Sequence, residues 1–387
     1  MMNYTQKYHE LKTLFHPGAD KSDIHGSDIS CFWADFDSQN MSALAGERDH
    51  KIYAHSVFNN MPDESISENY RFRYPVFKPA DTRKQRQAIL LLHGLNERNW
   101  NKYLVWAYYL ALKTGRPVIL FPIAFHMNRS PEAWSNPRIM SPVLLDRRKR
   151  LGEDPMSTFA NVALSERLCE DPLRFYTSGQ QSAADIVQLA GQLNRGEHPL
   201  FDKGTTIDIF AYSIGAFLSQ ILFLGNPAGL FTNARFFLFC GGAFFEEMDG
   251  VSRLIMDQQA FSRLRNYYIS ELGTEMHQSE LLAASMNQTE TGRSFLAMLK
   301  SETLKTFREN VFEKMQKQVQ AVALLKDRVI PAGGIVKALN RFIPVDVLDF
   351  PYDYSHETPF PILNAEKATL VDRGFESVFS KAAAFLQ

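Results

Sequence analysis

Cysteine is scarce in this chain of 387 residues. Its three cysteines, Cys31, Cys169 and Cys240, lie far apart. So few and so scattered, they exclude a disulfide framework and a cysteine-based zinc site. Net charge is also nearly absent, because 42 basic and 43 acidic side chains leave a formal charge of −1. This balance removes any bulk electrostatic reason to expect nucleic acid or an anionic membrane as a partner.

Long hydrophobic runs are missing as well. An apolar run such as Ala88 to Leu92 is far shorter than the roughly 20 residues of a membrane helix, so we expect no stable membrane insertion. The first 18 residues contain neither an apolar segment nor a small-residue cleavage site, so we expect no signal peptide and a cytoplasmic location. With 45% hydrophobic and 22% charged residues, the composition is that of an ordinary globular protein.

Turn-forming residues are frequent in the first 80 residues, which we interpret as an irregular N-terminal extension packing on the core. Two short pieces of it, Lys51–Phe58 and Arg71–Phe77, are strand-like. The extension could add antiparallel strands to a sheet or cover its edge. From residue 81 to 387 strands and helices alternate, which is typical of a single α/β domain.

Continuous apolar runs and helical periodicity locate the elements of this domain. Strands are expected at Ala88–Leu92, Pro117–Ile123, Thr206–Ala211, Ala234–Cys240, Gln320–Leu325 and Val345–Phe350. Helices are expected at Asn101–Thr114, Ser182–Asn194, Ile214–Leu224 and Leu370–Phe385. The alternation predicts a mostly parallel sheet covered by helices on both faces. Residues 126–181 and 244–317 are too long for simple connections, so we expect helical insertions there that cap a site.

The motif with the most specific chemistry is Ala211-Tyr212-Ser213-Ile214-Gly215. It follows a strand and opens a helix, which is the setting of a nucleophile elbow. The tight turn requires small residues around the serine, and Ala211, Gly215 and Ala216 satisfy this. The serine then lies at a helix N-terminus, where N–H groups favour a developing anion.

A serine nucleophile needs a general base and an acid that orients the base. Asp327 directly follows the strand at 320–325, and His356 follows the last strand. Because the carboxyl ends of parallel strands meet at one edge, we expect both to approach Ser213. Asp353, Glu246 and Glu247 are possible substitutes for Asp327.

The turn Leu92-His93-Gly94-Leu95-Asn96 follows the first strand of the domain. Acyl transfer requires two N–H donors aimed at the oxyanion. The glycine lets the backbone turn back toward the nucleophile, and we assign the donors to the backbone N–H groups of Leu95 and Ile214.

Taken together, the strand-His-Gly turn, the serine elbow, the Asp327-x-Val-Ile-Pro segment and the post-strand His356 resemble the α/β-hydrolase superfamily, in particular its serine esterases and lipases. The resemblance covers residues from about 85 to 387 without the two insertions. It implies an α/β-hydrolase fold and a Ser-Asp-His triad without a metal or organic cofactor. Ala211 departs from the glycine that is usual there.

The function predicted is hydrolysis of a carboxylic ester or thioester with an apolar acyl group, through an acyl-enzyme on Ser213. Acyl transfer to another acceptor, peptide cleavage, and ligand binding without catalysis on the same fold remain alternatives. The oligomeric state stays open. Candidate pocket residues near the strand ends are His93, Asn96, Tyr212, His126 and Arg129.

Overall fold

A computed structural model describes residues 2–387 except 17, 25, 41–43, 45–61, 81–84 and 363–364. In this part of the chain, one nine-stranded sheet contains β1 (Lys21–Asp23), β2 (Ile29–Asp37), β3 (Arg71–Pro79), β4 (Gln85–Leu92), β5 (Val118–Leu120), β6 (Phe201–Tyr212), β7 (Phe236–Phe239), β8 (Val319–Leu324) and β9 (Val345–Leu348).

The strand order across the sheet is β1-β2-β3-β5-β4-β6-β7-β8-β9. From β5 to β9 every neighbouring pair is parallel, whereas β1, β2 and β3 pair antiparallel with one another and β3 pairs antiparallel with β5. The central strands are apolar because both faces are covered, as in the fully buried Phe-Phe-Leu-Phe of β7. The expected mostly parallel α/β architecture is therefore confirmed.

The α-helices of the described residues alternate with these strands or cluster in the long connections. Their bounds are α1 (Tyr4–Leu14), α2 (Ser67–Tyr70), α3 (Asn101–Thr114), α4 (Pro137–Leu151), α5 (Val162–Glu170), α6 (Arg174–Arg195), α7 (Ile214–Gly225), α8 (Gln258–Asn266), α9 (Leu272–Gln278), α10 (Glu280–Gln288), α11 (Glu290–Leu299), α12 (Lys305–Met315), α13 (Ala332–Leu339) and α14 (Ala365–Leu386). None of the helices in the described ranges is both long and apolar enough to cross a membrane.

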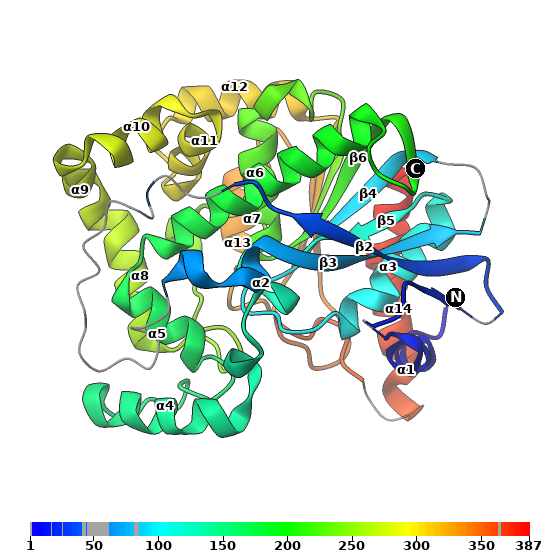
Figure 1. The fold of residues 1–387 in the computed structure, drawn as a ribbon, viewed down its shortest axis with the longest axis horizontal. Helices are drawn as coiled ribbons and strands as arrows, with labels where there is room; N and C mark the ends of the chain where they lie inside the picture. Colours follow the sequence, from blue (N-terminus) through cyan, green and yellow to red (C-terminus); the bar gives the residue numbers. More distant parts are fainter. Residues whose placement is uncertain are drawn as a thin grey trace.

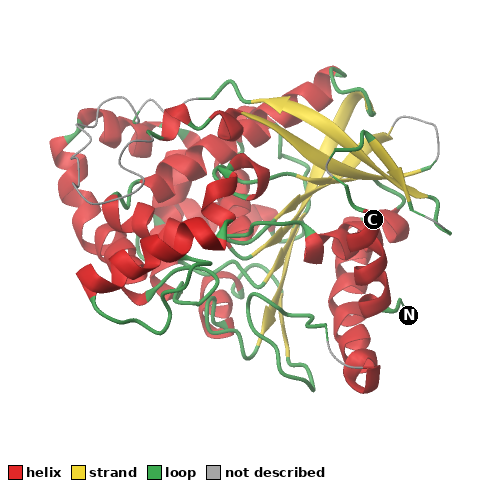
Figure 2. Ribbon diagram, turned by 60° about the horizontal axis from the view of Figure 1, so that its bottom comes forward, coloured by secondary structure: helices red, strands yellow, loops and turns green. Residues whose placement is uncertain are grey.

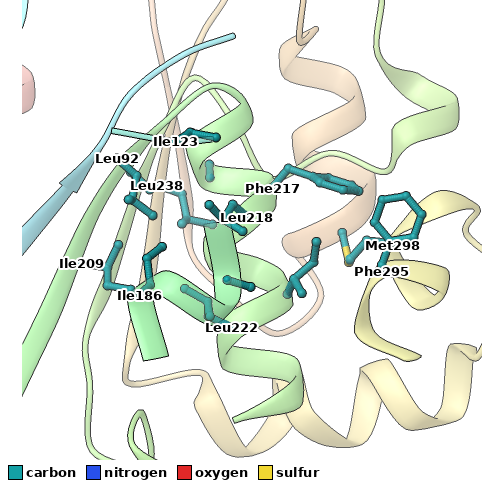
Figure 3. Packing of buried hydrophobic residues seen from close by; sticks show 14 of the residues in the cluster. Leu92, Ile123, Ile186, Ile209, Phe217, Leu218, Leu222, Leu238, Phe295 and Met298 are labelled. Carbon is teal, nitrogen blue, oxygen red and sulfur yellow. The ribbon is translucent and has the colours of Figure 1, made fainter. Parts of the chain in front are cut away.

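The sheet lies between two unequal helical layers (Figures 1 and 2). Helices α1, α3 and α14 cover one face and form an aromatic-rich core with it. The other face is covered by α6 and α7, against which the larger group of helices packs. Figure 3 shows this second core: Leu92 and Leu238 of the sheet face α7, and Phe217 points away from the sheet toward Phe295 of α11.

The two long connections carry the additional helices. Residues 126–181 hold α4, α5 and the start of α6, and residues 244–317 hold α8 to α12. A buried ion pair joins the two connections, since Arg147 of α4 donates from Nε to Asp257 Oδ2 at 2.6 Å and Asp257 caps the N-terminus of α8. The two connections therefore pack as one unit.

Several sequence expectations differ from the structure. The N-terminal extension is more regular than expected, because α1 and the nine-residue β2 precede the expected strand at 71–77, found as β3. The strand at 117–123 is shorter, as β5 covers only Val118–Leu120, and α6 begins at Arg174, well before the expected helix. The strand-like piece Lys51–Phe58 lies outside the described residues.

Candidate functional site

The turn between β6 and α7 holds Ser213 in a backbone conformation that L-residues rarely adopt. Its φ is 59° and its ψ −123°. Backbone strain of this kind costs on the order of 1–3 kcal/mol and persists only where the surroundings hold it. Here β6 leads directly into α7, and the N–H of Ser213 donates to the carbonyl oxygen of Phe239 in β7 at 3.1 Å. The serine therefore sits on a tight strand-to-helix turn, as in a nucleophile elbow.

Two glycines make room for this turn. A Cβ on Gly215 would lie 2.8 Å from the carbonyl oxygens of Leu92 and His93, and one on Gly241 would lie 2.5 Å from the Cβ of Ala216. Gly215 was predicted from the sequence, whereas Gly241 was missed. The signal for it was the Gly241-Gly242 pair directly after the strand that neighbours β6.

The Gly215→Ala variant is expected to be destabilised, because its Cβ would meet backbone atoms rather than a movable side chain. Overpacking typically costs about 1–3 kcal/mol. Urea unfolding followed by circular dichroism measures the loss. Gly273→Ala is the matched control, since a Cβ added there would meet nothing within 4 Å and alanine favours a helix. Equal unfolding midpoints for Gly215→Ala and wild type would contradict this account.

Three side chains predicted from the sequence meet beside this turn. Ser213 Oγ lies 2.6 Å from His356 Nε2, and His356 Nδ1 lies 2.7 Å from Asp327 Oδ2. Asp327 follows β8 and His356 follows β9, so both come from the carboxyl edge of the sheet, where β6 also delivers Ser213. All three residues are at most 5% exposed. A continuous hydrogen-bonded path therefore runs from a carboxylate through an imidazole to a hydroxyl.

The second oxygen of Asp327 is occupied by the backbone. Oδ1 accepts hydrogen bonds from the N–H groups of Val329 and Ile330, both at 2.9 Å. These bonds orient the carboxylate so that Oδ2 faces the imidazole of His356.

The substitute acids named from the sequence lie elsewhere. Glu246 accepts a hydrogen bond from the N–H of Ser301 at 2.7 Å, and Glu247 pairs with Lys337. Asp353 is exposed. The carboxylate in contact with the imidazole of His356 is that of Asp327.

Tyr212 supports the imidazole from one side. Its ring is stacked on that of His356, with centroids 5.4 Å apart, and its hydroxyl donates to the carbonyl oxygen of His356. Burial raises the pKa of Tyr212 well above its usual value, so the phenol stays a donor. Lys102, which was not predicted from the sequence, lies with its Nζ 4.7 Å from the centroid of the same ring and donates to the carbonyl oxygen of Glu357 at 2.9 Å.

The turn after β4 is held from several directions. Gly94 donates its N–H to the hydroxyl of Tyr103 at 3.0 Å. Asn96 adopts a left-handed φ of 59°, and its Nδ2 donates to the carbonyl oxygens of Ala160 and Leu254 at 2.8 and 2.7 Å. Because these two carbonyls belong to the two long connections, Asn96 links both of them to the turn that carries Leu95.

Three adjoining pockets surround this turn. The mouth pocket, about 270 Å³, contains Ser213 and His356 and has a polar rim that includes Asn96, Arg98 and Lys102. The apolar pocket, about 50 Å³, is lined by Leu95, Ile214 and side chains that include Ile123, Phe175, Phe217 and Phe295; three of these are labelled in Figure 3. The arginine pocket, also about 50 Å³, is lined by residues that include Arg98, Arg167 and Arg174. Leu95 lines all three.

Of the candidate pocket residues, the structure places Asn96 and Tyr212 in the mouth pocket and His126 in the other two. His93 and Arg129 are fully buried and line none of these three pockets. His93 Nε2 accepts from the N–H of Ile123 at 2.9 Å, while Arg129 pairs with Asp185 at 2.6 Å. His93 therefore binds the backbone of the loop that follows β5, and Arg129, which lies in that loop, ties it to Asp185. Neither residue lines one of these pockets, which differs from the sequence expectation.

Across the described ranges, no group of three or more His, Cys, Asp or Glu side chains is placed to hold a metal ion. The strand order, the elbow and the chain order Ser213, Asp327, His356 make this an α/β-hydrolase fold, as the sequence resemblance implied.

Comparison with known proteins gives one family and several similar structures. No curated protein matches the chain. Among solved structures it is similar to a bacterial heroin esterase (10% identity, 100% of this chain and 91% of that chain covered, TM-score 0.45). It is also similar to an esterase from Pyrobaculum calidifontis (10% identity, 98% of this chain and 91% of that chain covered, TM-score 0.45). A third similar structure is a peroxisomal alpha-beta-hydrolase from Saccharomyces cerevisiae (13% identity, 92% of this chain and 89% of that chain covered, TM-score 0.40). DUF6051, described as a family of unknown function, matches residues 2–387, and the chain therefore belongs to that family.

Proposed function

We propose that the protein is a serine hydrolase that cleaves a carboxylic ester or thioester through an acyl-enzyme on Ser213. The observation that carries this proposal is the buried path of hydrogen bonds from Asp327 through His356 to Ser213. A hydroxyl is a weak nucleophile until an adjacent base removes its proton, and the base must present the correct nitrogen. In this path Nε2 of His356 faces the hydroxyl and Nδ1 faces the carboxylate.

The reaction has two halves that use the same groups. Ser213 Oγ forms a bond to the acyl carbon while its proton moves to His356 Nε2, and the negative charge develops on the former carbonyl oxygen. When the tetrahedral intermediate collapses, the bond to the leaving oxygen or sulfur breaks and that atom takes the proton from Nε2. Water then attacks the acyl-enzyme by the same route, giving one proton to Nε2. That proton passes to Ser213 Oγ as the acid is released.

For the oxyanion we propose the backbone N–H groups of Leu95 and Ile214. Ile214 is the first residue of α7, and the first N–H groups of a helix lack partners within the helix. Leu95 lies in the turn that Gly94 and Asn96 anchor, and it lines the mouth pocket beside Ser213. Each such donor typically contributes a few kcal/mol to transition-state stabilisation.

The pockets on either side of this turn suggest how the substrate lies. The acyl group would enter the apolar pocket, whose wall includes Phe175, Phe217 and Phe295. The leaving group would occupy the mouth pocket, in which both long connections contribute to the wall through Ala160 and Leu254. Because the rim of the mouth pocket is polar, water can reach the acyl-enzyme there, which favours hydrolysis over transfer to another acceptor. We propose that the two connections act as the cap.

Labelling with a fluorophosphonate probe tests the nucleophile directly. The wild type is expected to be labelled and to hydrolyse p-nitrophenyl esters, and Ser213→Ala to do neither, because the probe reacts only with an activated serine. Ser380→Ala is the matched control, since this exposed hydroxyl on α14 donates to the carbonyl oxygen of Glu376 in its own helix.

Labelling of Ser380→Ala at the wild-type level together with loss in Ser213→Ala is the supporting result. Equal labelling of Ser213→Ala and wild type would assign the reactive serine elsewhere. No labelling of the folded wild type would contradict the hydrolase proposal and would favour ligand binding without catalysis.

A further inference from the structure

The wall of the arginine pocket carries more positive than negative charge. Arg98, Arg167 and Arg174 line this pocket. The carboxylates paired with these arginines are Asp63, which meets Arg167 at 2.9 Å and Arg174 at 3.4 Å, and Glu170, which pairs with Arg174. Arg98 makes no ion pair within the described part of the chain. Three guanidinium groups therefore face two carboxylates, and one positive charge is left over.

Glu97 also lines the arginine pocket but does not cancel this charge. Its carboxylate pairs with Lys102 and accepts a hydrogen bond from the hydroxyl of Tyr103 at 2.8 Å. His126, which lines the pocket as well, adds no charge at pH 7, because burial lowers its pKa to about 4. The remaining positive charge is therefore that of a guanidinium group.

Arg98 has N–H groups that a ligand can reach. It is partly exposed and lines both the arginine pocket and the mouth pocket. Its Nη2 donates to the carbonyl oxygen of Ala160, whereas Nε and Nη1 have no hydrogen-bond partner among the described residues. The enclosed side-chain atoms without a partner belong to other residues, so Nε and Nη1 of Arg98 keep accessible surface. Partial burial lowers the pKa of Arg98, and a bound anion would oppose that effect.

Arg167 is a more deeply buried cation in the same wall. Its side chain is only 6% exposed, and its guanidinium carbon lies 4.4 Å from the ring centroid of Trp134 and 5.1 Å from that of Phe125. One edge is held by Asp63, to which Nη2 donates. Nε and Nη1 have no partner in the described ranges and are not among the enclosed atoms. Burial lowers the pKa of Arg167 despite Asp63, with Arg174 adding to the effect, so its charge is incompletely balanced.

We propose that the substrate carries a carboxylate, and that this carboxylate binds in the arginine pocket by accepting hydrogen bonds from Arg98 and Arg167. The inference rests on the proposed hydrolase function and specifies its substrate class as esters or thioesters with a free acid group. One unbalanced positive charge in a pocket of about 50 Å³ suits a carboxylate better than a phosphate monoester, whose charge is about −1.5 to −2. Hydrogen bonds between charged groups are the strong ones, and arginine recognises carboxylates well.

Either half of an ester can bring the carboxylate to this pocket. The arginine pocket shares Phe175 and Ser178 with the apolar pocket, so the acid group can end the acyl chain. It shares Asn96 and Arg98 with the mouth pocket, so the acid group can instead belong to the leaving group. The mouth pocket itself is less suitable for an anion, because Glu357 lines it.

The test uses pairs of substrates that differ only in charge. In the acyl arm, mono-p-nitrophenyl adipate and suberate are compared with the esters in which the free acid is a carboxamide. In the leaving-group arm, 3- and 4-acetoxybenzoate are compared with the corresponding acetoxybenzamides. The ratio of kcat/KM for the acid to that for its amide is expected to fall about 10- to 100-fold in Arg98→Met in one of the arms, the size expected for a hydrogen bond to a charged group. Arg98→Lys keeps the charge and should retain part of the ratio.

Three further measurements protect this test. Arg98→Met leaves no carboxylate without its partner, whereas Arg167→Met, which should also lower the ratio, leaves Asp63 paired with Arg174 alone. Arg138→Met is the matched control, since Arg138 is exposed on α4 of the same long connection and lines none of the three pockets. Fluorophosphonate labelling counts competent sites in every variant.

The outcomes separate the two proposals. If the wild type is not labelled, the hydrolase function fails and the carboxylate inference with it. If labelling is normal but the ratio is unchanged in Arg98→Met and Arg167→Met in both arms, only the carboxylate inference is overturned. A fall confined to one arm supports the inference and identifies the half of the substrate that carries the acid. An equal fall in Arg138→Met would reveal a general effect of charge and would overturn the role of the arginine pocket.

Discussion

The Asp327→Asn variant is expected to show a kcat/KM for p-nitrophenyl esters about 10⁴-fold below that of the wild type. The reason lies in how the backbone holds this side chain. Because the N–H groups of Val329 and Ile330 both donate to Oδ1, an asparagine must keep its oxygen at that position. Its amide N–H₂ would then face His356 Nδ1, which can only accept from it. The ring proton would move to Nε2, and the base would face Ser213 with the wrong tautomer.

Asp353→Asn is the matched control, because Asp353 lies three residues before His356 yet is exposed. It should keep wild-type kinetics, and both variants should retain the wild-type unfolding midpoint. Steady-state kinetics of both variants on one ester show which of the two carboxylates acts on His356. A large loss in Asp353→Asn with little change in Asp327→Asn would reverse the assignment of the acid.

A second large effect is expected for stability. Arg129→Met should lower the free energy of unfolding by about 3–5 kcal/mol, the range measured when one partner of a buried ion pair is removed. Arg129 and Asp185 are both completely buried and meet at 2.6 Å. The guanidinium also donates to the carbonyl oxygens of Asn69 and Pro122 at 2.9 and 3.0 Å. The substitution therefore leaves a carboxylate and two carbonyls without these donors.

Urea unfolding of the single and double variants measures the effect. Arg129→Met/Asp185→Leu should be more stable than Arg129→Met alone, since it also removes the unpaired charge. Arg195→Met is the surface control: Arg195 pairs with Glu197, and both side chains are at least half exposed, so its midpoint should not change. An Arg129→Met midpoint as high as that of Arg195→Met would show that the buried pair contributes little.

The sequence predicts those features of the fold and the site that are marked by residues adjacent in the chain, and it misses those that depend on residues distant in the chain. Ser213, Asp327 and His356 could be located because each directly follows an apolar run, and parallel strands end at a common edge. Gly241 and Lys102 were missed, since their importance comes from neighbours distant in the chain. His93 and Arg129 were interpreted as pocket residues, because nothing adjacent in the sequence indicates that Asn69 and Asp185 surround Arg129.

The strand β2 was not predicted from the sequence for a different reason. The nine residues of β2 include Asp35 and Asp37, polar positions that obscure an apolar run, yet β2 pairs along its whole length with β3. Its regularity depends on a partner strand that lies well beyond it in the chain. The start of α6 was missed because Arg174 and the residues after it include many polar side chains, several of which line the pockets.

The packing of α1 against α14 (Figure 1) has a consequence for how the chain acquires its fold during translation. Tyr4 donates its N–H to Asp372 Oδ1, 368 residues later, and its ring contacts that of Phe375. A nascent chain therefore carries α1 outside the ribosome long before α14 has been synthesised. Until then Tyr4 of α1 has no α14 to cover it, and this apolar surface is a target for chaperones. Docking of α1 on α14 can only be a late step in folding.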